Sequence, residues 1–483
     1  MSVGVLSEKG DKPGRELKKD LGLKEVVATV MTSVIGGGLF LTTVQIQEEV
    51  PVGSNVIFSY LLAALPAFFV ALSYAVLSSA IPSSGGDYIY ISRIVDPTTG
   101  FLVTWVRWFG MVAGISAISI GDLALISNMF TAVGWDSARF FIVHYRIPLA
   151  IAVILTFLTV NYLGVKIYGR VQDIMFLLLL SGILLYIVAG LPHVRPEYLT
   201  SSARGGLQDV LRASSIVFFS YIGFAAIADA GGEVKNAKRT LPRGIVISVV
   251  LIAVFYVLVA TITYGTAPLD AVTEAGNVPA AAMLFLPSFI SLYISFTAFI
   301  ALVSDINPSI LATSRLSFAW AKDKVVPHRL SELSRFHTPK WTLAMNGAIA
   351  IFIVLAFSEF IEAIDVTTIA ILMTYAAVCL ATFVMPYKRP DLWKKAEVKY
   401  RGTWLISLLG LVTTLLLLGY LVQVSLFQFL VVVVWMGIGG LVYHMTREKH
   451  ELDRRIISEK MRALREMEEW VVLFTKHSGK EKK

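Results

Sequence analysis

Long apolar runs separated by short polar connections dominate the chain. A run of about 20 apolar residues is long enough to cross the hydrocarbon core of a membrane as a helix. Twelve such runs are found, at 24–46, 55–80, 101–130, 148–164, 168–191, 208–231, 243–266, 285–312, 341–357, 364–386, 403–422 and 426–446. The pattern predicts an all-α, polytopic membrane protein with twelve transmembrane helices.

The first run is interrupted at its centre by Gly36, Gly37 and Gly38. Each glycine weakens a helix by about 1 kcal/mol relative to alanine, so a local break is predicted here. Unpaired N–H and C=O groups are tolerated in hydrocarbon only where they face protein or water. The break favours a binding site, because free amides attract carboxylates and free carbonyls attract cations. Close helix packing against a glycine face is the alternative interpretation.

The sixth run is interrupted in a similar way by Ser220 and Gly223. Two discontinuous helices at matching positions are typical of transporters built from inverted repeats. Because an odd number of spans inverts the second copy, the first ten runs predict a 5+5 inverted repeat with broken helices 1 and 6. The predicted divisions are a cytoplasmic N-terminal segment (1–23), a first five-helix repeat (24–191), a second repeat (192–386), helices 11 and 12 (387–446) and a cytoplasmic helical tail (447–483).

Composition excludes a soluble globular protein. Hydrophobic residues make up 56% and charged residues 16% of the chain, whereas soluble proteins carry about 25% charged residues. The net charge of +8 is accounted for by loop residues that orient membrane helices, so no nucleic-acid partner is required. The single cysteine, Cys379, lies in a predicted span and excludes a disulfide framework.

The loop charges predict the orientation. An even number of spans places both termini on one side, and positively charged loops stay in the cytoplasm. The basic residues on the side of the N-terminus are Lys166, Arg170, Lys235, Lys238, Arg239, Arg243, Lys322, Lys324, Arg329, Arg335, Lys340, Lys388, Arg389, Lys394, Lys395, Lys399 and Arg401. We therefore expect a multi-pass protein of the plasma membrane with cytoplasmic N- and C-termini.

Three motifs resemble signatures of the amino acid/polyamine/organocation (APC) transporters. VIGGGLF at 34–40 is similar to the helix 1 signature of that superfamily, and FSYIGFAAIADAGGEVKNAKRTLPRGI at 219–245 resembles the signature of helix 6 and its following loop. SRLSFAWAKDKVVP at 314–327 is similar to the segment after helix 8. The resemblance covers the first ten spans and implies a LeuT-type fold with alternating access around a central site.

The resemblance also implies which residues bind an amino acid substrate. The amides of Gly36, Gly37 and Gly38 would receive the carboxylate, and the carbonyls near Phe219, Ser220 and Tyr221 would receive the α-ammonium. Phe219 would also close the pocket as an aromatic gate. The expected substrate-binding set is Ile35, Gly36, Gly37, Gly38, Phe219, Ser220, Tyr221 and Gly223.

Three acidic residues lie inside apolar runs: Asp122, Asp229 and Asp305. An ionised carboxylate there costs roughly 2.5 to 3.5 kcal/mol, so such residues usually face a cavity and titrate or bind cations. Asp305 is the first candidate for coupling to H⁺ or Na⁺; a hydrogen bond to a neighbouring helix is the alternative role for Asp122 and Asp229. Some proton-coupled relatives carry a lysine in helix 5, and Leu179 stands in its place.

Glu233 and Arg315 lie at the cytoplasmic ends of the sixth and eighth runs. Opposite charges gathered at one mouth can pair when the inner gate closes and separate when it opens. We therefore predict that these two residues form a cytoplasmic gate. Retention of basic loops on the cytoplasmic side is the simpler interpretation of the charges around them.

The sequence favours a proton-coupled transporter of neutral amino acids. No acid lies within the first break or within 219–228, where a cationic substrate would be bound. If Asp122 or Asp229 enters the pocket, cationic amino acids or polyamines are favoured instead. An exchanger, a Na⁺-coupled symporter and a transporter-like nutrient sensor are the further alternatives, and the oligomeric state is left open.

An enzyme is not predicted. All seven histidines fall in loops, at the end of the last span or in the tail, so no metal or other cofactor is expected. No phosphate-binding glycine loop with its lysine is present, so direct use of ATP is not expected either. The expected partners are an amino acid, H⁺ or Na⁺, and membrane lipid.

Overall fold

The computed structural model describes residues 17–133, 135–356 and 363–446, without the side chains of 122, 124–129, 131–133 and 363–364. Most of the predicted N-terminal segment, the whole predicted tail at 447–483 and the side chain of Asp122 therefore lie outside the described residues. The described part is helical apart from three isolated bridges between loop residues. The prediction of an all-α fold is confirmed.

Nine described segments are long and apolar enough to cross a membrane. Their helices are α4 (Val56–Ala80), α6 (Pro97–Val133), α9 (Val165–Gly190), α11 (Leu207–Val217) with α12 (Ala226–Asp229), α13 (Ala237–Gly265), α16 (Ser288–Lys322), α18 (Ala363–Lys388), α20 (Thr403–Val424) and α21 (Leu426–Met445). A tenth is α7 (Asp136–His144) with α8 (Arg146–Tyr162), if these two helices, bent by 76°, form one span. The shorter apolar helix α17 (Lys340–Ala356) coincides with the ninth predicted run.

The first predicted span is broken into three helices. They are α1 (Leu23–Val34), α2 (Gly37–Phe40) and α3 (Thr42–Glu49). Ile35 is extended, with φ −82° and ψ 100°, and Gly36 lies between the first two helices with φ −153° and ψ −129°. The break therefore falls at the glycines, as the sequence predicts.

The sixth span is also discontinuous. Between α11 and α12 the chain forms the 3-10 turn η3 (Phe218–Tyr221), and after α12 it forms η4 (Gly231–Glu233). Gly223 has a φ of +123°, and a Cβ atom there would lie 2.2 Å from the Ser33 carbonyl oxygen. Only glycine permits both this backbone conformation and this approach to the end of α1.

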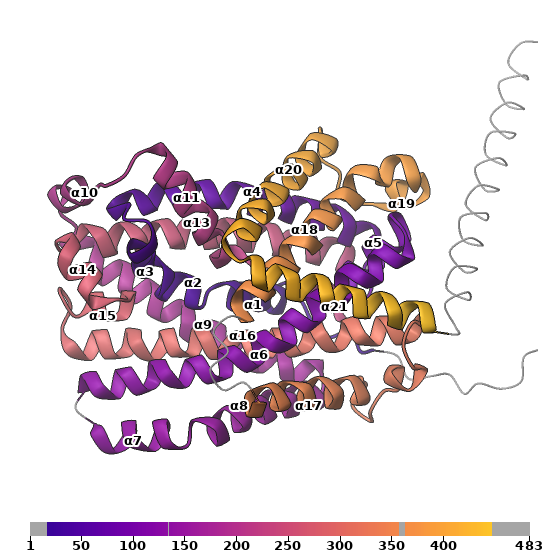
Figure 1. Ribbon diagram of the computed structural model, residues 1–483, viewed down its shortest axis with the longest axis horizontal. Coiled ribbons are helices and arrows are strands. Elements are labelled where there is room, and N and C mark those ends of the chain that lie inside the picture. Colours follow the sequence, from indigo (N-terminus) through magenta and orange to yellow (C-terminus); the bar gives the residue numbers. More distant parts are fainter. Residues whose placement is uncertain (1–16, 134, 357–362, 447–483) are drawn as a thin grey trace, which may run out of the picture.

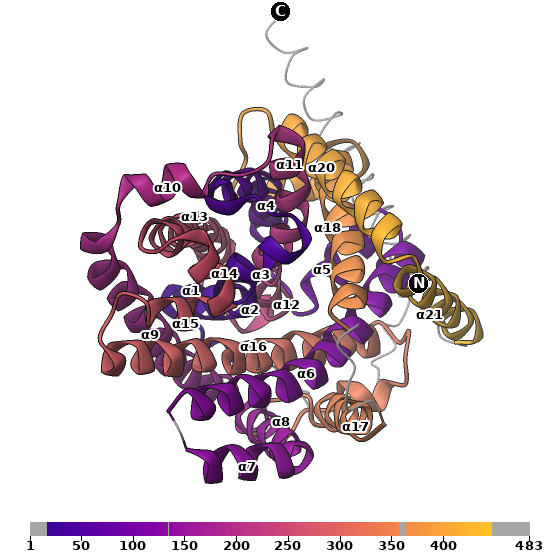
Figure 2. The same ribbon diagram turned by 60° about the vertical axis from the view of Figure 1, so that its left-hand side comes forward.

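The broken helices occupy the middle of the bundle. Figure 2 shows α1, α2, α3 and α12 surrounded by longer helices, and α1 contacts α9, α12, α13 and α16. Figure 1 shows α6 and α16 side by side along the length of the molecule. The shorter described elements are η1 (Gly53–Asn55), α5 (Gly86–Ile94), η2 (Leu191–His193), α10 (Pro196–Ser202), α14 (Leu269–Ala275), α15 (Val278–Ala282), η5 (His328–Ser331) and α19 (Pro390–Lys395).

Both ends of the described chain meet at one end of the bundle, which we call the chain-end face. Near the N-terminus, Leu21 forms a parallel bridge with Val234, just after η4. Near the other end, the Thr446 hydroxyl donates to the carbonyl of Val325, just after α16. Glu233 and Arg315 pair between these two points, so this face is where the predicted gate residues lie.

Candidate substrate and gating site

The break in the first span exposes backbone amides. Among the described residues, no carbonyl accepts a backbone hydrogen bond from the N–H groups of Gly36, Gly37 or Gly38, although the Gly36 carbonyl accepts from Leu39 at 3.2 Å. A Cβ atom at Gly36 would lie 3.9 Å from the Ala301 carbonyl oxygen of α16, an ordinary contact, so the backbone is not tightly packed at this point of the break. Free amides at a helix start are suited to a carboxylate.

Of the three sixth-span carbonyls expected to bind an ammonium group, two already accept a hydrogen bond. The Phe219 carbonyl accepts from the Ile222 N–H at 3.1 Å, and the Ser220 carbonyl oxygen lies 2.6 Å from the Tyr256 hydroxyl. Among the described groups, none donates to the carbonyl of Tyr221. Of the three carbonyls expected to receive an ammonium group, Tyr221 therefore offers the unoccupied one.

Two tyrosines hold the broken segments together. The Tyr256 hydroxyl on α13 lies 3.0 Å from the Val34 carbonyl oxygen as well as 2.6 Å from that of Ser220. A hydroxyl has one proton, so it donates to one of these carbonyls at a time. The Tyr60 hydroxyl on α4 donates to the Gly38 carbonyl at 3.0 Å, and the two rings pack edge to face at 5.2 Å.

Direct contact also joins the two breaks. The Ser220 hydroxyl donates to the Gly38 carbonyl at 3.0 Å. A Cβ atom at Gly38 would lie 2.5 Å from Ser220 Cα, which is closer than real Cβ atoms come to a neighbour. The packing interpretation of the glycine run therefore holds for Gly38, whereas a Cβ atom at Gly36 would make only ordinary contacts with Ala301 and Leu302.

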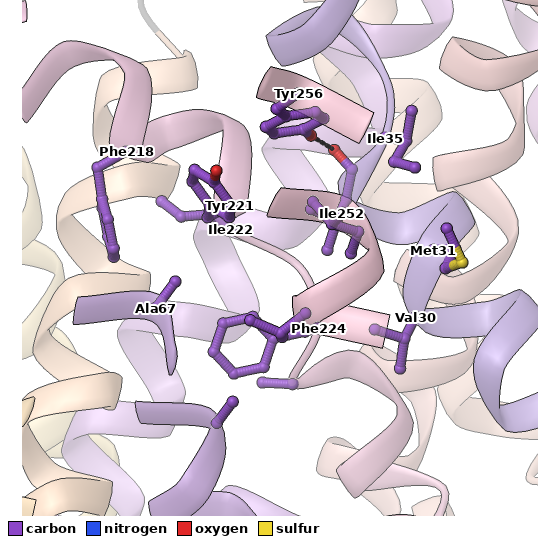
Figure 3. Close-up of a cluster of buried hydrophobic side chains, with 14 of the residues drawn as sticks. Val30, Met31, Ile35, Ala67, Phe218, Tyr221, Ile222, Phe224, Ile252 and Tyr256 are labelled. Carbon is purple, nitrogen blue, oxygen red and sulfur yellow. Dashed lines mark hydrogen bonds between the residues drawn. The ribbon is translucent and has the colours of Figure 1, made fainter. Parts of the chain in front are cut away.

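Apolar and aromatic side chains surround the breaks. Ile35 and Tyr221 are buried, and Phe219 is partly exposed. Figure 3 shows Tyr221 and Phe224 of the sixth span among apolar side chains of α1 and α13. Phe224 stacks on Tyr375 of α18 with ring centroids 5.0 Å apart. Neutral side chains of this kind suit an uncharged, apolar ligand.

A chain of buried amides connects α1 with three other helices. Asn161 of α8 donates to the side-chain oxygen of Asn307 at 2.8 Å, and Asn307 of α16 donates to that of Gln172 at 2.6 Å. Gln172 of α9 in turn donates to the hydroxyl of Thr32 on α1. Apart from Asn161 Oδ1, which has no partner among the described residues, these polar groups satisfy one another inside the bundle, as burial away from water requires.

Asp305 lies on α16 two residues before Asn307 and is partly exposed. The Ser309 hydroxyl, one turn further along the helix, interacts favourably with the ionised form of its carboxyl. Among the described basic side chains, none forms a salt bridge with Asp305. An unpaired carboxyl within an apolar helix is suited to binding a proton or a cation.

Glu233 and Arg315 form a buried ion pair on the chain-end face. Arg315 Nε donates to Glu233 Oε1 at 2.5 Å and Arg315 Nη2 to Oε2 at 3.2 Å. Both side chains are at most 1% exposed. The Glu233 carbonyl accepts from the N–H groups of Asp20 and Leu21 at 3.0 and 3.1 Å, so the pair joins α16, the end of the sixth span and the N-terminal segment.

Asp229 belongs to a second buried ionic cluster. Arg107 Nη1 on α6 lies 2.7 Å from Asp229 Oδ2 and 2.9 Å from Asp87 Oδ2 on α5. Asp229 therefore has a neighbouring helix as its partner. A bond to a neighbouring helix is the alternative to a coupling role that the sequence offers for Asp229.

The sequence motifs do not indicate several residues that the structure places in this site. Tyr60, Tyr256 and Asp87 lie within or beside ordinary apolar runs. Arg107 is the exception, since a lone arginine within the third apolar run requires an acidic partner. The amides Asn161 and Gln172 are also polar residues within predicted spans, and that is the signal by which their network can be sought. Among the described residues, no group of three or more His, Cys, Asp and Glu side chains is arranged to hold a metal ion.

The described chain combines apolar spans, two broken helices that lie side by side, and buried ion pairs at one end. These features are typical of a membrane transport protein rather than an enzyme. The chain belongs to the amino acid permease family, which it matches over residues 21–449. It is 26% identical over 453 residues to a branched-chain amino acid permease of Bacillus subtilis, covering 90% of this chain and 94% of the relative.

Two further relatives come from the same bacterium. A methylthioribose transporter is 25% identical over 451 residues, with 91% of this chain and 95% of the relative covered. A serine/threonine exchanger is 26% identical over 379 residues, with 76% and 84% covered. These relatives are all small-molecule transporters, and they differ in substrate and mode of transport.

Proposed function

We propose that the protein transports neutral, apolar amino acids across the plasma membrane by alternating access, coupled to protons. The proposal is carried by the pair of broken helices, which touch through Ser220 and Gly38 and which offer the free amides of Gly36, Gly37 and Gly38 and the free carbonyl of Tyr221. The amides bind the substrate carboxylate and the carbonyl binds its α-ammonium. Ile35, Phe219 and Gly223 complete the walls of the site.

The charge distribution supports a neutral substrate. Within the two breaks the described side chains are apolar, aromatic or hydroxyl-bearing. The nearest acid on the sixth span, Asp229, is already paired with Arg107. Among the described residues of the two breaks themselves, no carboxylate is available to a cationic side chain, and the similarity to a branched-chain amino acid permease agrees with this substrate class.

The coupling proton is assigned to Asp305. Its carboxyl has no ionic partner among the described residues. Asp305 also precedes Asn307 by two positions on α16, and Asn307 belongs to the amide network that reaches α1. Protonation neutralises a charge that is costly within the bundle. Movement of α1 relative to α16 can then depend on whether the proton is bound.

The architecture proposed with this function is a twelve-helix bundle. The first ten spans form a 5+5 inverted repeat, and α20 and α21 are added to it. The chain-end face is cytoplasmic, because the predicted basic loops belong to that side. The buried pair of Glu233 and Arg315 is then the closed inner gate.

Uptake of radiolabelled amino acids into proteoliposomes tests the function. We expect branched-chain and other apolar amino acids to accumulate when an inward proton gradient is imposed, and not when a Na⁺ gradient is imposed alone. Asp305→Asn is expected to abolish accumulation while exchange of labelled for unlabelled substrate persists. Asp270→Asn, on the exposed helix α14, is the matched control and should accumulate substrate normally.

Two outcomes contradict parts of the proposal. Preservation of proton-driven uptake in Asp305→Asn would show that Asp305 does not carry the proton. Uptake that ignores both gradients and requires internal amino acid would identify an exchanger, the second candidate function favoured by the similarity to a serine/threonine exchanger.

A further inference from the structure

The ionic cluster between α5, α6 and α12 has unequal numbers of charges. It contains one guanidinium, Arg107, and two carboxyl groups, Asp87 and Asp229. All three side chains are at most 2% exposed. If both acids are ionised, the cluster holds one uncompensated negative charge in the interior, and burial of such a charge is strongly unfavourable.

The two acids are not equivalent. Asp229 accepts from Arg107 Nη1 at 2.7 Å through one oxygen and from the Asp87 backbone N–H at 3.4 Å through the other. Neither carboxyl oxygen of Asp87 has a hydrogen bond among the described residues, although Oδ2 lies 2.9 Å from Arg107 Nη1. Asp229 is the ionised partner of Arg107, and Asp87 is the acid whose charge lacks compensation.

Hydroxyl groups without partners surround Asp87. The titratable groups that face it are Arg107 from α6, Asp229 from α12, Tyr74 from α4, Tyr90 from its own helix and Tyr375 from α18. The hydroxyls of Tyr74 and Tyr90 are buried and, within the described part of the chain, have no hydrogen-bond partner. Helix α5 lies outside the apolar spans; burial raises the pKa of the Asp87 carboxyl, Arg107 lowers it, and the charge of Asp229 raises it further.

We propose that Asp87 binds one proton while the chain-end face is closed and releases it when that face opens. Opening separates α5 from the end of the sixth span and lets water reach the carboxyl. The O–H bond of Asp87 then breaks, the electron pair stays on the carboxylate, and the proton passes to water. This inference rests on the proposed function, because alternating access supplies the opening.

The contacts between α5 and the end of the sixth span must separate before water can reach Asp87. The Gly85 N–H donates to the Asp229 carbonyl at 2.7 Å, and a Cβ atom at Gly86 would lie 2.5 Å from the Ala228 carbonyl oxygen. Ser84 forms an antiparallel bridge with Ala230. The start of α5 therefore packs closely against the end of the sixth span, and water is excluded from Asp87 only while these contacts persist.

Opening of the chain-end face should depend on pH in one direction. The closed state holds a proton that the open state loses, because a hydrated Asp has its ordinary pKa of about 3.9. Opening is therefore favoured as pH rises, by up to about tenfold per pH unit for one released proton. In Asp87→Asn the side chain mimics the protonated acid, so opening should stay rare at every pH.

Labelling of a cysteine at Ser84 measures opening without transport. Gly232 covers the Ser84 side chain, since a Cβ atom built at Gly232 would lie 2.4 Å from Ser84 Oγ. In a Cys379→Ala background, membrane fragments carrying Ser84→Cys are reacted with a charged maleimide between pH 6 and 9. Rates are divided by those of Arg329→Cys, an exposed position, which removes the intrinsic pH dependence of thiol reactivity.

We expect the corrected rate to rise with pH and to become flat in Asp87→Asn. Asp87→Glu keeps an ionisable group and should restore the rise, which covers the case in which the asparagine variant does not fold. A corrected rate independent of pH with Asp87 intact, or a rise that persists in Asp87→Asn, would overturn the proposal. Absence of amino acid transport in proteoliposomes would instead overturn the proposed function and leave this result standing.

Discussion

At the scale of single residues, Gly38 lies where the two broken spans touch. Gly38→Ala places a Cβ atom 2.5 Å from the backbone of Ser220, and backbone cannot rotate aside as a side chain can. We expect a loss of about 1 to 3 kcal/mol in the free energy of unfolding, typical of overpacking a buried contact. Transport should fall as well, because the two breaks are pushed apart.

Thermal unfolding in detergent and uptake in proteoliposomes measure these two effects. The control is Gly419→Ala on the exposed side of α20, where a Cβ atom would meet nothing within 4 Å. A helical glycine in open space should gain up to about 1 kcal/mol on substitution by alanine. Equal behaviour of the two variants would contradict the contact between the breaks.

At the scale of elements, the pair of Glu233 and Arg315 ties the sixth span, α16 and the N-terminal segment into one closed face. Glu233→Gln leaves Arg315 charged and buried without its partner, which typically costs about 3 to 5 kcal/mol. We expect reduced stability of the closed form and slower accumulation of substrate. Glu233→Gln combined with Arg315→Met should recover part of the loss, because no unpaired charge remains.

Denaturant unfolding of the single and double variants measures the coupling between these two positions. The matched control is Glu397→Gln, which breaks an exposed pair with Arg239 at 2.8 Å. That change should alter stability by less than about 1 kcal/mol. Additive effects of Glu233→Gln and Arg315→Met would show that the two residues do not act together.

At the scale of the whole molecule, the distribution of basic loops predicts which face is cytoplasmic. Single cysteines at Glu274, on α14, and at Lys394, on α19, place one exposed label near each end of the bundle. In intact cells a membrane-impermeant maleimide should label the first and not the second, and permeabilised cells should label both. The reverse pattern would invert the proposed topology.

The helical membrane class and the positions of the breaks follow from local sequence. Apolar runs and glycines act locally: a span follows from about 20 consecutive residues, and a break follows from residues that lack a Cβ. Local sequence also predicts that Glu233 and Arg315 lie at the same face, because both residues stand at the predicted cytoplasmic ends of apolar runs. The structure brings the two side chains into contact.

Which side chains complete the site depends on contacts between helices that are far apart in the sequence. Tyr256 bonds Val34 from 222 residues away, and Arg107 pairs with Asp229 from a distance of 122 residues. Such partners depend on how helices pack, and hydropathy along the chain does not encode which face of one helix meets another. For the same reason, the sequence leaves Asp229 open between a coupling role and a bond to a neighbouring helix, and only packing against α5 and α6 reveals that Arg107 is its partner and that Asp87 shares this partner.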